Sequence, residues 1–387
     1  MPTVKLGDVV ERIKDKIDKD ATDLEYYIGG EHFDYGEVVI TKKAPLMGST
    51  IGPAFHMRFM PDDVLLMSRN PHLRKAGKVD FEGICSDVSY VCRTKDENVL
   101  LQGYLPFVFQ TDNFWEFAES NKKGSTNFFL NWSDFTRYEF FLPDIEKQRE
   151  LTDLLWAAAD AKAAYQHLLE QTDELVKSQF IEMFGDPVTN PMGWPVQRMG
   201  ALGELKNGMN FSSRDEGLRI RSLGVGDFQD YDRIENVEEL SLISLNEMPS
   251  RDYLLKNGDI VFVRSTGNRA LVGRSVVVYP NETPTTFSGF CIRYRVNNER
   301  VFTIYLINLL HNDAVRDKLL NSGRGANITN LNQQVLSALL VPLPPLDLQK
   351  RFAAFVESTD KSKFELKQAI DSTSGLIRAL MQQDLSN

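Results

Sequence analysis

The feature that most constrains this chain is a long-range internal repeat. The segment FFLPDIEKQRELTDLLWAAADAK, which begins at Phe140, returns in outline as VPLPPLDLQKRFAAFVESTDKSK at Val341. In both copies a Leu-Pro pair ends an apolar run, a glutamine follows, and a long helix-forming segment begins. The two glutamines, Gln148 and Gln349, stand 201 positions apart. Such a distance excludes a single local motif.

The correspondence extends well beyond this segment. At the same spacing Tyr104 matches Tyr305 and Asn131 matches Asn332, and further upstream DDVLLMSR matches GDIVFVRS after a small shift. Loop insertions would produce such a shift. The period is far longer than that of solenoid repeats, so the sequence indicates the duplication of a whole domain plus a helix.

Each copy has a globular part and a helical part. Short β-rich runs such as DIVFV and GRSVVVY are bounded by Gly, Pro and Asn, and helical stretches such as TIYLINLLHNDAVRDKLLNSG lie between them. This mixture predicts an α/β (α+β) domain. The Leu-Pro pairs close each domain, because the residue before a proline avoids the helix. We expect globular domains over residues 1–142 and 185–342, and long helices over 143–184 and 343–387.

The helical parts show the spacing of a coiled-coil seam, in which apolar residues recur at alternating steps of three and four. The predicted seam residues are Leu151, Leu154, Ala158, Tyr165, Leu168 and Leu175 in the first helix and Phe352, Val356, Leu366, Ile370, Ile377 and Leu380 in the second. Connectivity requires the paired helices to run antiparallel, which predicts a pseudo-two-fold arrangement. The alternative is an ordinary amphipathic core helix in each copy. A helix of this length spans on the order of 55 Å.

Composition limits the class of protein. A hydrophobic content of 42% and a charged content of 25% are typical of a globular chain. No apolar run reaches membrane-spanning length and the start lacks a signal peptide, so we expect a cytoplasmic protein whose three cysteines are reduced core residues. The net charge of −10 argues against a free-standing nucleic-acid binder, unless partners or small basic patches supply the affinity for phosphate.

Basic and amide side chains gather in corresponding loops of the two copies. Arginine suits bidentate reading of guanine, and asparagine suits adenine. The candidate DNA-contacting residues of the first copy are Arg69, Asn70, His72, Arg74, Lys75, Lys78, Lys122, Lys123 and Asn127. Those of the second copy are Arg219, Arg221, Arg264, Arg269, Arg274, Arg324 and Asn327, with Arg293 and Arg295 on a following strand. The alternative is that each charge only solvates a surface loop.

Motifs for catalysis are missing from the sequence. A methyltransferase would need an Asn/Asp-Pro-Pro-Tyr-type motif and a Gly-rich cofactor loop, and the nearest strings, NPHL and NPMG, do not fit. The five histidines lack the spacing of metal ligands. We therefore expect no catalytic, cofactor-binding or metal-binding residues in this chain.

The chain resembles the specificity subunit of type I restriction–modification enzymes. The resemblance covers nearly the whole sequence, and FLPDIEKQ, PLPPLDLQ, NGDIVFVRSTG, GRGANITNLN and MFGDPVTNPMGWP carry it as an ordered set. It implies a non-catalytic subunit with two target-recognition domains that read a bipartite DNA site, in defence against foreign DNA. It also implies helices that set the gap between the half-sites and dock two methyltransferase subunits, which bind S-adenosylmethionine. Motor-nuclease subunits, which use ATP and magnesium, would join that complex.

Two other interpretations remain open from the sequence. The recognition subunit of a type IIB-like enzyme, or of a solitary adenine-methylation system, would show the same features. A two-headed protein-interaction scaffold that never contacts DNA would also have two similar domains and long helices. The sequence specifies neither the recognised bases nor the length of the gap.

Overall fold

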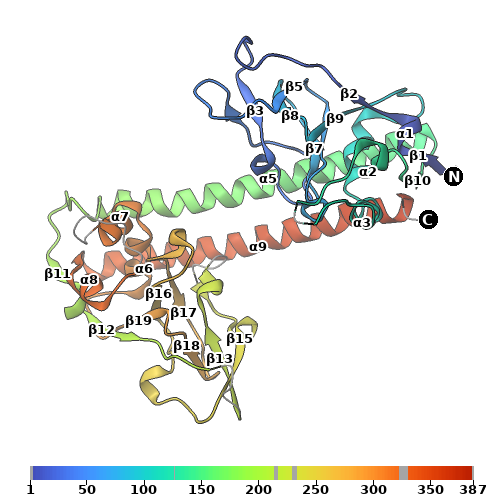
Figure 1. Cartoon of the computed structure of the whole chain (residues 1–387). Coiled ribbons are helices and arrows are strands. Elements are labelled where there is room, and N and C mark those ends of the chain that lie inside the picture. Colours follow the sequence, from blue (N-terminus) through green and yellow to red (C-terminus); the bar gives the residue numbers. More distant parts are fainter. Residues whose placement is uncertain (1–2, 126, 213–216, 229–232, 322–329, 386–387) are drawn as a thin grey trace. The chain divides into compact units, whose positions relative to one another are not determined.

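The computed structural model describes residues 3–125, 127–212, 217–228, 233–321 and 330–385. The chain divides into two compact units (Figure 1). Unit 1 comprises Met1–Leu168 and Leu366–Asn387, and unit 2 comprises Leu169–Glu365. Two long helices, α5 (Ile145–Phe184) and α9 (Leu346–Leu385), each contribute one part to unit 1 and the other part to unit 2.

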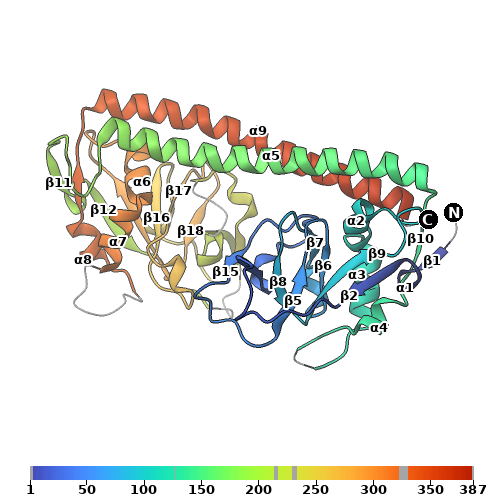
Figure 2. The same cartoon turned by 90° about the horizontal axis from the view of Figure 1, so that it is seen from above.

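The globular part of unit 1 is built mainly from short strands. Its described strands form two four-stranded sheets, β2-β9-β6-β7 and β4-β3-β8-β5, and the pair β1-β10 (Figure 2). The strands are β1 (Thr3–Lys5), β2 (Val10–Ile13), β3 (Tyr26–Ile28), β4 (Ala44–Pro45), β5 (Phe55–Phe59), β6 (Val64–Met67), β7 (Ala76–Lys78), β8 (Gly83–Ser86), β9 (Ser89–Thr94) and β10 (Glu139–Phe141). The short helices are α1 (Leu6–Val9), α2 (Leu105–Phe109), α3 (Asp112–Ser120) and α4 (Trp132–Phe135).

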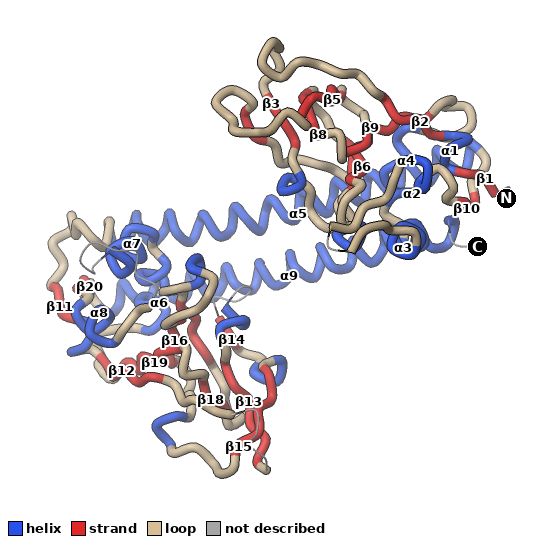
Figure 3. The backbone as a smooth tube through the Cα atoms, viewed as in Figure 1, coloured by secondary structure: helices blue, strands red, loops and turns tan. Residues whose placement is uncertain are grey.

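The globular part of unit 2 follows the same plan. Its described strands form the sheets β12-β19-β16-β17-β14 and β15-β13-β18 and the pair β11-β20 (Figure 3). The strands are β11 (Val196–Arg198), β12 (Gly203–Asn207), β13 (Leu218–Leu223), β14 (Arg233–Ile234), β15 (Ser241–Leu245), β16 (Asp259–Val263), β17 (Ser275–Val278), β18 (Thr285–Phe287), β19 (Cys291–Val296) and β20 (Leu340–Pro342). The helices are α6 (Thr303–His311), α7 (Asp313–Asn321) and α8 (Gln333–Ala338).

The two globular parts match in strand pairing as well as in order. The parallel pair β3 and β8 corresponds to the parallel pair β13 and β18. In each unit the first strand pairs antiparallel with the last, so that Thr3 lies opposite Phe141 and Val196 lies opposite Pro342. The predicted mixed α/β class and the internal repeat are therefore confirmed.

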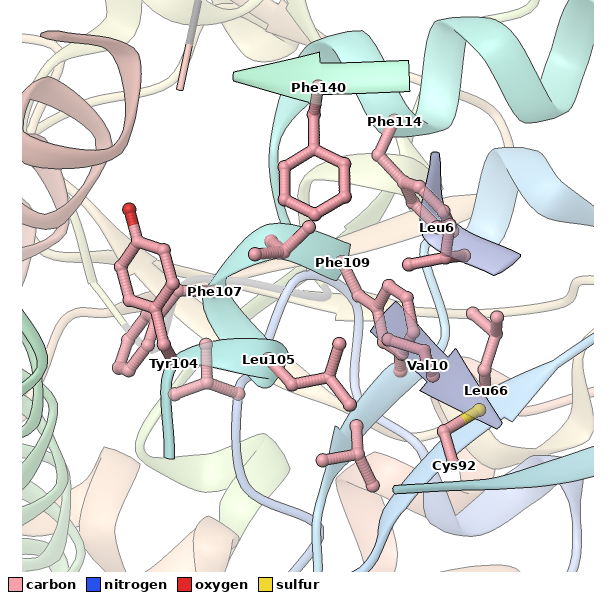
Figure 4. Close-up of a cluster of buried hydrophobic side chains, with 14 of the residues drawn as sticks. Leu6, Val10, Leu66, Cys92, Tyr104, Leu105, Phe107, Phe109, Phe114 and Phe140 are labelled. Carbon is pink, nitrogen blue, oxygen red and sulfur yellow. The ribbon is translucent and has the colours of Figure 1, made fainter. Parts of the chain in front are cut away.

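The core of unit 1 lies where α2, α3 and the first turns of α5 cover the β2-β9-β6-β7 sheet. All five residues of α2 are buried. Figure 4 shows buried side chains of this core, among them Leu6, Phe107, Phe109, Phe114 and Phe140. Cys92 lies in this core, and the other two cysteines are also buried, so the expectation of free core thiols is confirmed.

The two long helices pair in both units. In unit 1, Leu151 and Leu155 near the start of α5 share a core with Ile377 and Met381 near the end of α9. Because the start of one helix packs with the end of the other, the helices run antiparallel. In unit 2 the roles are exchanged, and the buried residues are Val176, Phe180 and Phe184 of α5 with Phe352 and Val356 of α9. The Phe180 and Phe352 rings meet edge to face at 5.5 Å.

The residues predicted for the seam differ in burial. Leu151, Ala158, Phe352, Val356 and Ile377 are buried. Tyr165, Leu366, Ile370 and Leu380 are half-buried.

The seam prediction is wrong at Leu154, Leu168 and Leu175, which are 46–51% exposed. The buried neighbours are Leu155 and Val176 instead. The cause is that each helix end packs against its own globular part as well as against the other helix. For example, the Trp156 indole donates a hydrogen bond to the carbonyl of Gly103 (2.8 Å). That packing rotates the buried face away from a simple two-helix stripe.

Each long helix begins at the same hydrogen-bonded joint. The Gln148 side chain is fully buried, and its Nε2 donates to the carbonyls of Pro143 (2.8 Å) and Val99 (2.8 Å). Its Oε1 accepts from the amide of Leu101 (3.0 Å). Gln349, which is also fully buried, makes the equivalent bonds in unit 2. The repeated glutamine thus fastens the first turn of each helix to its domain.

Candidate nucleic-acid interface

The two candidate loops of unit 1 are joined by backbone pairing. Arg69 forms an antiparallel bridge with Phe129. On either side of that bridge, the amide of Asn70 donates to the carbonyl of Phe128 (2.9 Å) and the amide of Leu130 donates to that of Ser68 (2.9 Å). Residues 68–74 and the described residues of 122–130, which are far apart in sequence, are therefore joined, and we call them loop pair 1.

Unit 2 contains the corresponding arrangement. Ser265 bridges Asn330, and the amide of Leu331 donates to the carbonyl of Arg264 (2.8 Å). The Arg264 guanidinium Nε lies 3.4 Å from the Asn330 side-chain oxygen. We call residues 264–274 together with 330–331 loop pair 2. Arg324 and Asn327, two of the predicted contact residues, lie outside the described residues.

The backbone of loop pair 1 is held in an unusual conformation. Asn70 and Arg74 flank a short 3₁₀ turn, and both have positive φ, at 51° and 47°. Asparagine adopts this left-handed region readily, whereas arginine does so rarely. Arg74 is held there by an ion pair with Asp112 (2.5 Å), at the start of α3. Arg74 therefore supports the loop, and its charge already has a partner.

Several other predicted contact residues are also ion-paired within their own unit. The pairs are Lys78–Asp62 (2.8 Å), Lys122–Glu119 (2.7 Å), Lys123–Asp134 (2.7 Å) and Arg221–Glu238 (2.8 Å). The pair with Lys123 lowers the pKa of the Asp134 carboxyl. Lys75 donates to the backbone carbonyl of Gly30 (2.5 Å). The acidic partners of Lys78 and Arg221 are exposed, so these two ion pairs are weak and their cations remain able to exchange partners with a phosphate.

A smaller set of candidates is exposed and has no ion pair with any described residue. The set consists of Arg69, His72, Asn127, Arg219 and Arg269. Arg69, His72 and Asn127 belong to loop pair 1, Arg269 belongs to loop pair 2, and Arg219 lies on β13. These side chains are the most accessible of the predicted contacts.

Arg274 occupies a different kind of place. It lines a pocket of about 500 Å³ in unit 2, between α5 and the start of α7. In the backbone pairing its counterpart in unit 1 is Lys75, because the carbonyl of Lys75 accepts from the amide of Met67 as that of Arg274 accepts from the amide of Val263. We therefore assign Arg274 to the junction between loop pair 2 and the helices.

The prediction that Arg293 belongs to the basic surface is wrong, because Arg293 is buried, whereas Arg295 is half-buried and ion-paired. Arg295 forms a two-pronged ion pair with Asp259 (2.7 and 2.6 Å), which repeats the pair of Arg93 with Asp63 in unit 1. Arg293 is only 3% exposed, and its Nε and Nη1 lack a hydrogen-bond partner among the described residues. Burial lowers the pKa of Arg293. The alternation of β19 places both side chains on the same face of the strand, where Arg293 is buried and Arg295 is half-buried.

Neither a membrane span nor a metal cluster is found in the described parts of the chain. No helix there is long and apolar enough to cross a bilayer. No group of three or more His, Cys, Asp or Glu side chains there could hold a metal ion.

Comparison with known proteins shows which family the chain resembles. The family model of the type I restriction modification DNA specificity domain matches residues 191–373, which lie mainly in unit 2. The StySPI specificity subunit of Salmonella potsdam is 22% identical over 350 residues, which cover 85% of this chain and 74% of that protein. The MjaVIII specificity subunit of Methanocaldococcus jannaschii is 21% identical over 390 residues, which cover 92% and 85%.

Solved structures share the fold of this chain. The crystal structure of a type I restriction–modification S subunit from M. genitalium has a TM-score of 0.55 at 13% identity, and the match covers 99% of this chain and 96% of that one. A chain from a study of complex assembly and conformational transition of the type I system also has a TM-score of 0.55, at 18% identity, with coverage of 99% and 97%.

The duplicated fold and the matched domain define a DNA-specificity protein of the restriction–modification class. Residues 191–373 of the chain match the DNA specificity domain of type I restriction–modification systems, and the chain is similar over most of its length to type I specificity subunits. It is the DNA specificity subunit of a type I enzyme complex and is itself non-catalytic.

Proposed function

We propose that each unit of this subunit reads one half of a bipartite, non-palindromic DNA site. The observation that carries this proposal is the pair of equivalent loop pairs, which share a backbone frame and differ in side chains. Loop pair 1 presents Arg69 and His72, whereas loop pair 2 presents Arg264 and Arg269. Equal frames with unequal side chains suit the reading of two different half-sites.

The long helices would set the gap between the half-sites and dock two methyltransferase subunits. The helices are 40 residues long each, which corresponds to about 60 Å. That length is between one and two turns of B-DNA, at roughly 34–36 Å per turn. In this proposal target-recognition domains cover residues 1–142 and 185–342, and spacer helices cover 143–184 and 343–387.

The chemistry would reside in partner subunits. The methyltransferase subunits would bind S-adenosylmethionine and methylate a flipped-out adenine. Motor-nuclease subunits would supply cleavage with ATP and magnesium, and the complex would work in the cytoplasm. This chain would contribute double-stranded DNA recognition and no cofactor. A type IIB-like or solitary methylation system would use the same subunit without those motor-nuclease subunits.

Exchange of loop side chains tests the proposal. Arg69 and His72 are replaced by alanine in the complex with the methyltransferase, and the methylated motif is mapped by single-molecule sequencing. We expect the bases of one half-site to change or relax while the other half is retained. The matched variant, with Arg264 and Arg269 replaced, should affect the other half. A change in both halves from either variant, or in neither, contradicts the proposal.

Salt dependence separates DNA reading from protein scaffolding. Binding of the wild-type complex to duplex DNA is measured at increasing salt, because each neutralised phosphate releases counterions and steepens the loss of affinity. A protein-interaction scaffold would show no such slope. The measurement uses the complex, since the chain alone has a net charge of −10.

A further inference from the structure

Each unit presents one strongly exposed phenylalanine at its loop pair. Phe290 in unit 2 is 59% exposed, and Phe129 in unit 1 is 38% exposed. Neither was singled out from the sequence, because a lone Phe next to Gly or Phe gives no signal of its own. Most other phenylalanines of the globular parts lie in the cores. The position of these two beside basic loops therefore requires an explanation.

The backbone around Phe290 is fixed on several sides. The carbonyl of Phe290 accepts from the amides of Arg264 (2.8 Å) and Ser265 (3.4 Å), and its amide donates to the Ser288 hydroxyl (3.3 Å). The preceding Gly289 donates to the carbonyl of Met209 (2.8 Å). The ring is thus exposed from a rigid turn and does not belong to a freely moving loop.

Polar residues adjoin the backbone of Phe290. Arg264 follows the last residue of β16, one step beyond the pairing of Val263 with Cys291 in β19. Arg264 also contacts Asn330 through its Nε (3.4 Å). Loop pair 2 therefore brings together an arginine, an asparagine and an exposed aromatic ring from three separate segments.

Unit 1 has a comparable cluster, in which the exposed ring comes from a different segment of the repeat. Phe129 lies between two basic residues, in an antiparallel bridge with Arg69 on one side and with Lys123 on the other. The amide and carbonyl of Phe129 are both bonded to Lys123 (3.0 and 2.8 Å). In the repeat, Phe129 corresponds to Asn330 and Phe290 corresponds to Val88. The two units thus place their exposed ring on different segments.

We propose, on the basis of the proposed function, that Phe129 and Phe290 are specificity-determining residues that contact bases. The ring would lie against the thymine methyl group or the face of a base, next to the edge read by Arg69 or Arg264. Apolar contact with DNA bases uses this kind of side chain, and arginine and asparagine supply the hydrogen bonds. The different segments that carry the ring would help the units to distinguish their half-sites.

Alanine variants of the two rings test this inference in the full complex with the methyltransferase. Phe290→Ala should weaken binding to the cognate duplex by about tenfold or more and relax discrimination in one half-site only. Phe129→Ala should do the same in the other half-site. Each variant is the control for the other, because each should leave the other half-site unaffected. Phe290→Leu should retain part of the discrimination.

A matched control and the stability of the variants separate contact from folding. Met248→Ala changes an apolar side chain of unit 2 that is 50% exposed and lies outside both loop pairs and both long helices, and it should leave discrimination in both half-sites unchanged. Thermal unfolding of the ring variants should match the wild type, because the rings are exposed. Retention of affinity and discrimination within about twofold by both ring variants would overturn the inference. Failure of the wild-type complex to prefer any split site would instead refute the proposed function.

Discussion

The Nε2 of Gln349 donates a hydrogen bond to the carbonyl of Pro344, five residues earlier, at 2.8 Å. The same amide group donates to the carbonyl of Arg300 (3.0 Å), and its Oε1 accepts from the amide of Phe302 (2.8 Å). Gln148 repeats the set in unit 1. A buried primary amide satisfies three backbone groups at once and so fixes where the helix leaves its domain.

Loss of this amide should destabilise unit 2. Gln349→Leu leaves two carbonyls and one amide unpaired in a buried place, and each unpaired group costs about 1–3 kcal/mol. We expect the free energy of unfolding to fall by about 3 kcal/mol in urea titrations, with faster hydrogen exchange in the first turns of α9. Gln368→Leu, on an exposed position of the same helix, is the control. Equal stability of both variants would contradict this role.

The two arginines of β19, Arg293 and Arg295, should respond differently to the same substitution. Arg295→Met leaves the Asp259 carboxylate buried and unpaired, which should lower the free energy of unfolding by about 3 kcal/mol. Arg293→Met removes a buried guanidinium with unsatisfied nitrogens and should leave stability unchanged or raise it by about 1 kcal/mol. Val91 already stands at the equivalent place in unit 1. Urea unfolding of both variants measures the difference, and a larger loss for Arg293→Met would refute the assignment.

The three thiols should be inert in the folded protein. Burial raises the pKa of Cys85 and of Cys291 to about 12, and it raises that of Cys92 as well. Because the thiolate is the reactive form, almost none is present at pH 8. We expect no alkylation by iodoacetamide in native buffer at pH 8 and three modifications after unfolding in urea, as counted by intact-mass spectrometry. Rapid labelling of the native chain would show that the cores open.

Lengthening the helices should lengthen the recognised gap, if they act as the spacer. Four residues are inserted into each helix, after Leu168 in α5 and after Glu365 in α9, which adds about 6 Å. At 3.4 Å per base pair, the gap should grow by about two base pairs while both half-sites are retained. Sequencing of methylated DNA reads the gap directly. An unchanged gap would exclude the helices as the spacer. The control variant substitutes Leu168 and Glu365 without inserting any residue.

The large-scale architecture could be predicted from the sequence because each copy of the repeat encodes one globular part and one long helix. The match of Gln148 with Gln349 in the repeat predicts two units of the same plan. The long runs without Gly or Pro predict two long helices. The seam was predicted less well. Leu154, Leu168 and Leu175 follow the coiled-coil spacing, yet the packing of the helix ends against their own domains turns other residues inward.

The candidate interface could also be predicted only in part. The sequence identifies the loops that carry basic residues, but a list of cations does not reveal which of them are ion-paired. Arg74 is bound to Asp112, and Arg293 is buried in a sheet, because distant segments supply their surroundings. Phe129 and Phe290 could not be found from spacing, since their exposure depends on strand pairings between remote residues.

The pairing of β11 with β20 brings the first and last strands of one globular part side by side, and β1 and β10 do the same in the other. The chain therefore enters and leaves each domain through neighbouring positions, with the buried glutamine just beyond the exit. A foreign domain with the same closing strands could be grafted between these points without altering either helix. A new target sequence would then require the exchange of one globular domain. The proposed contacts of the helices with the other subunits would stay unchanged.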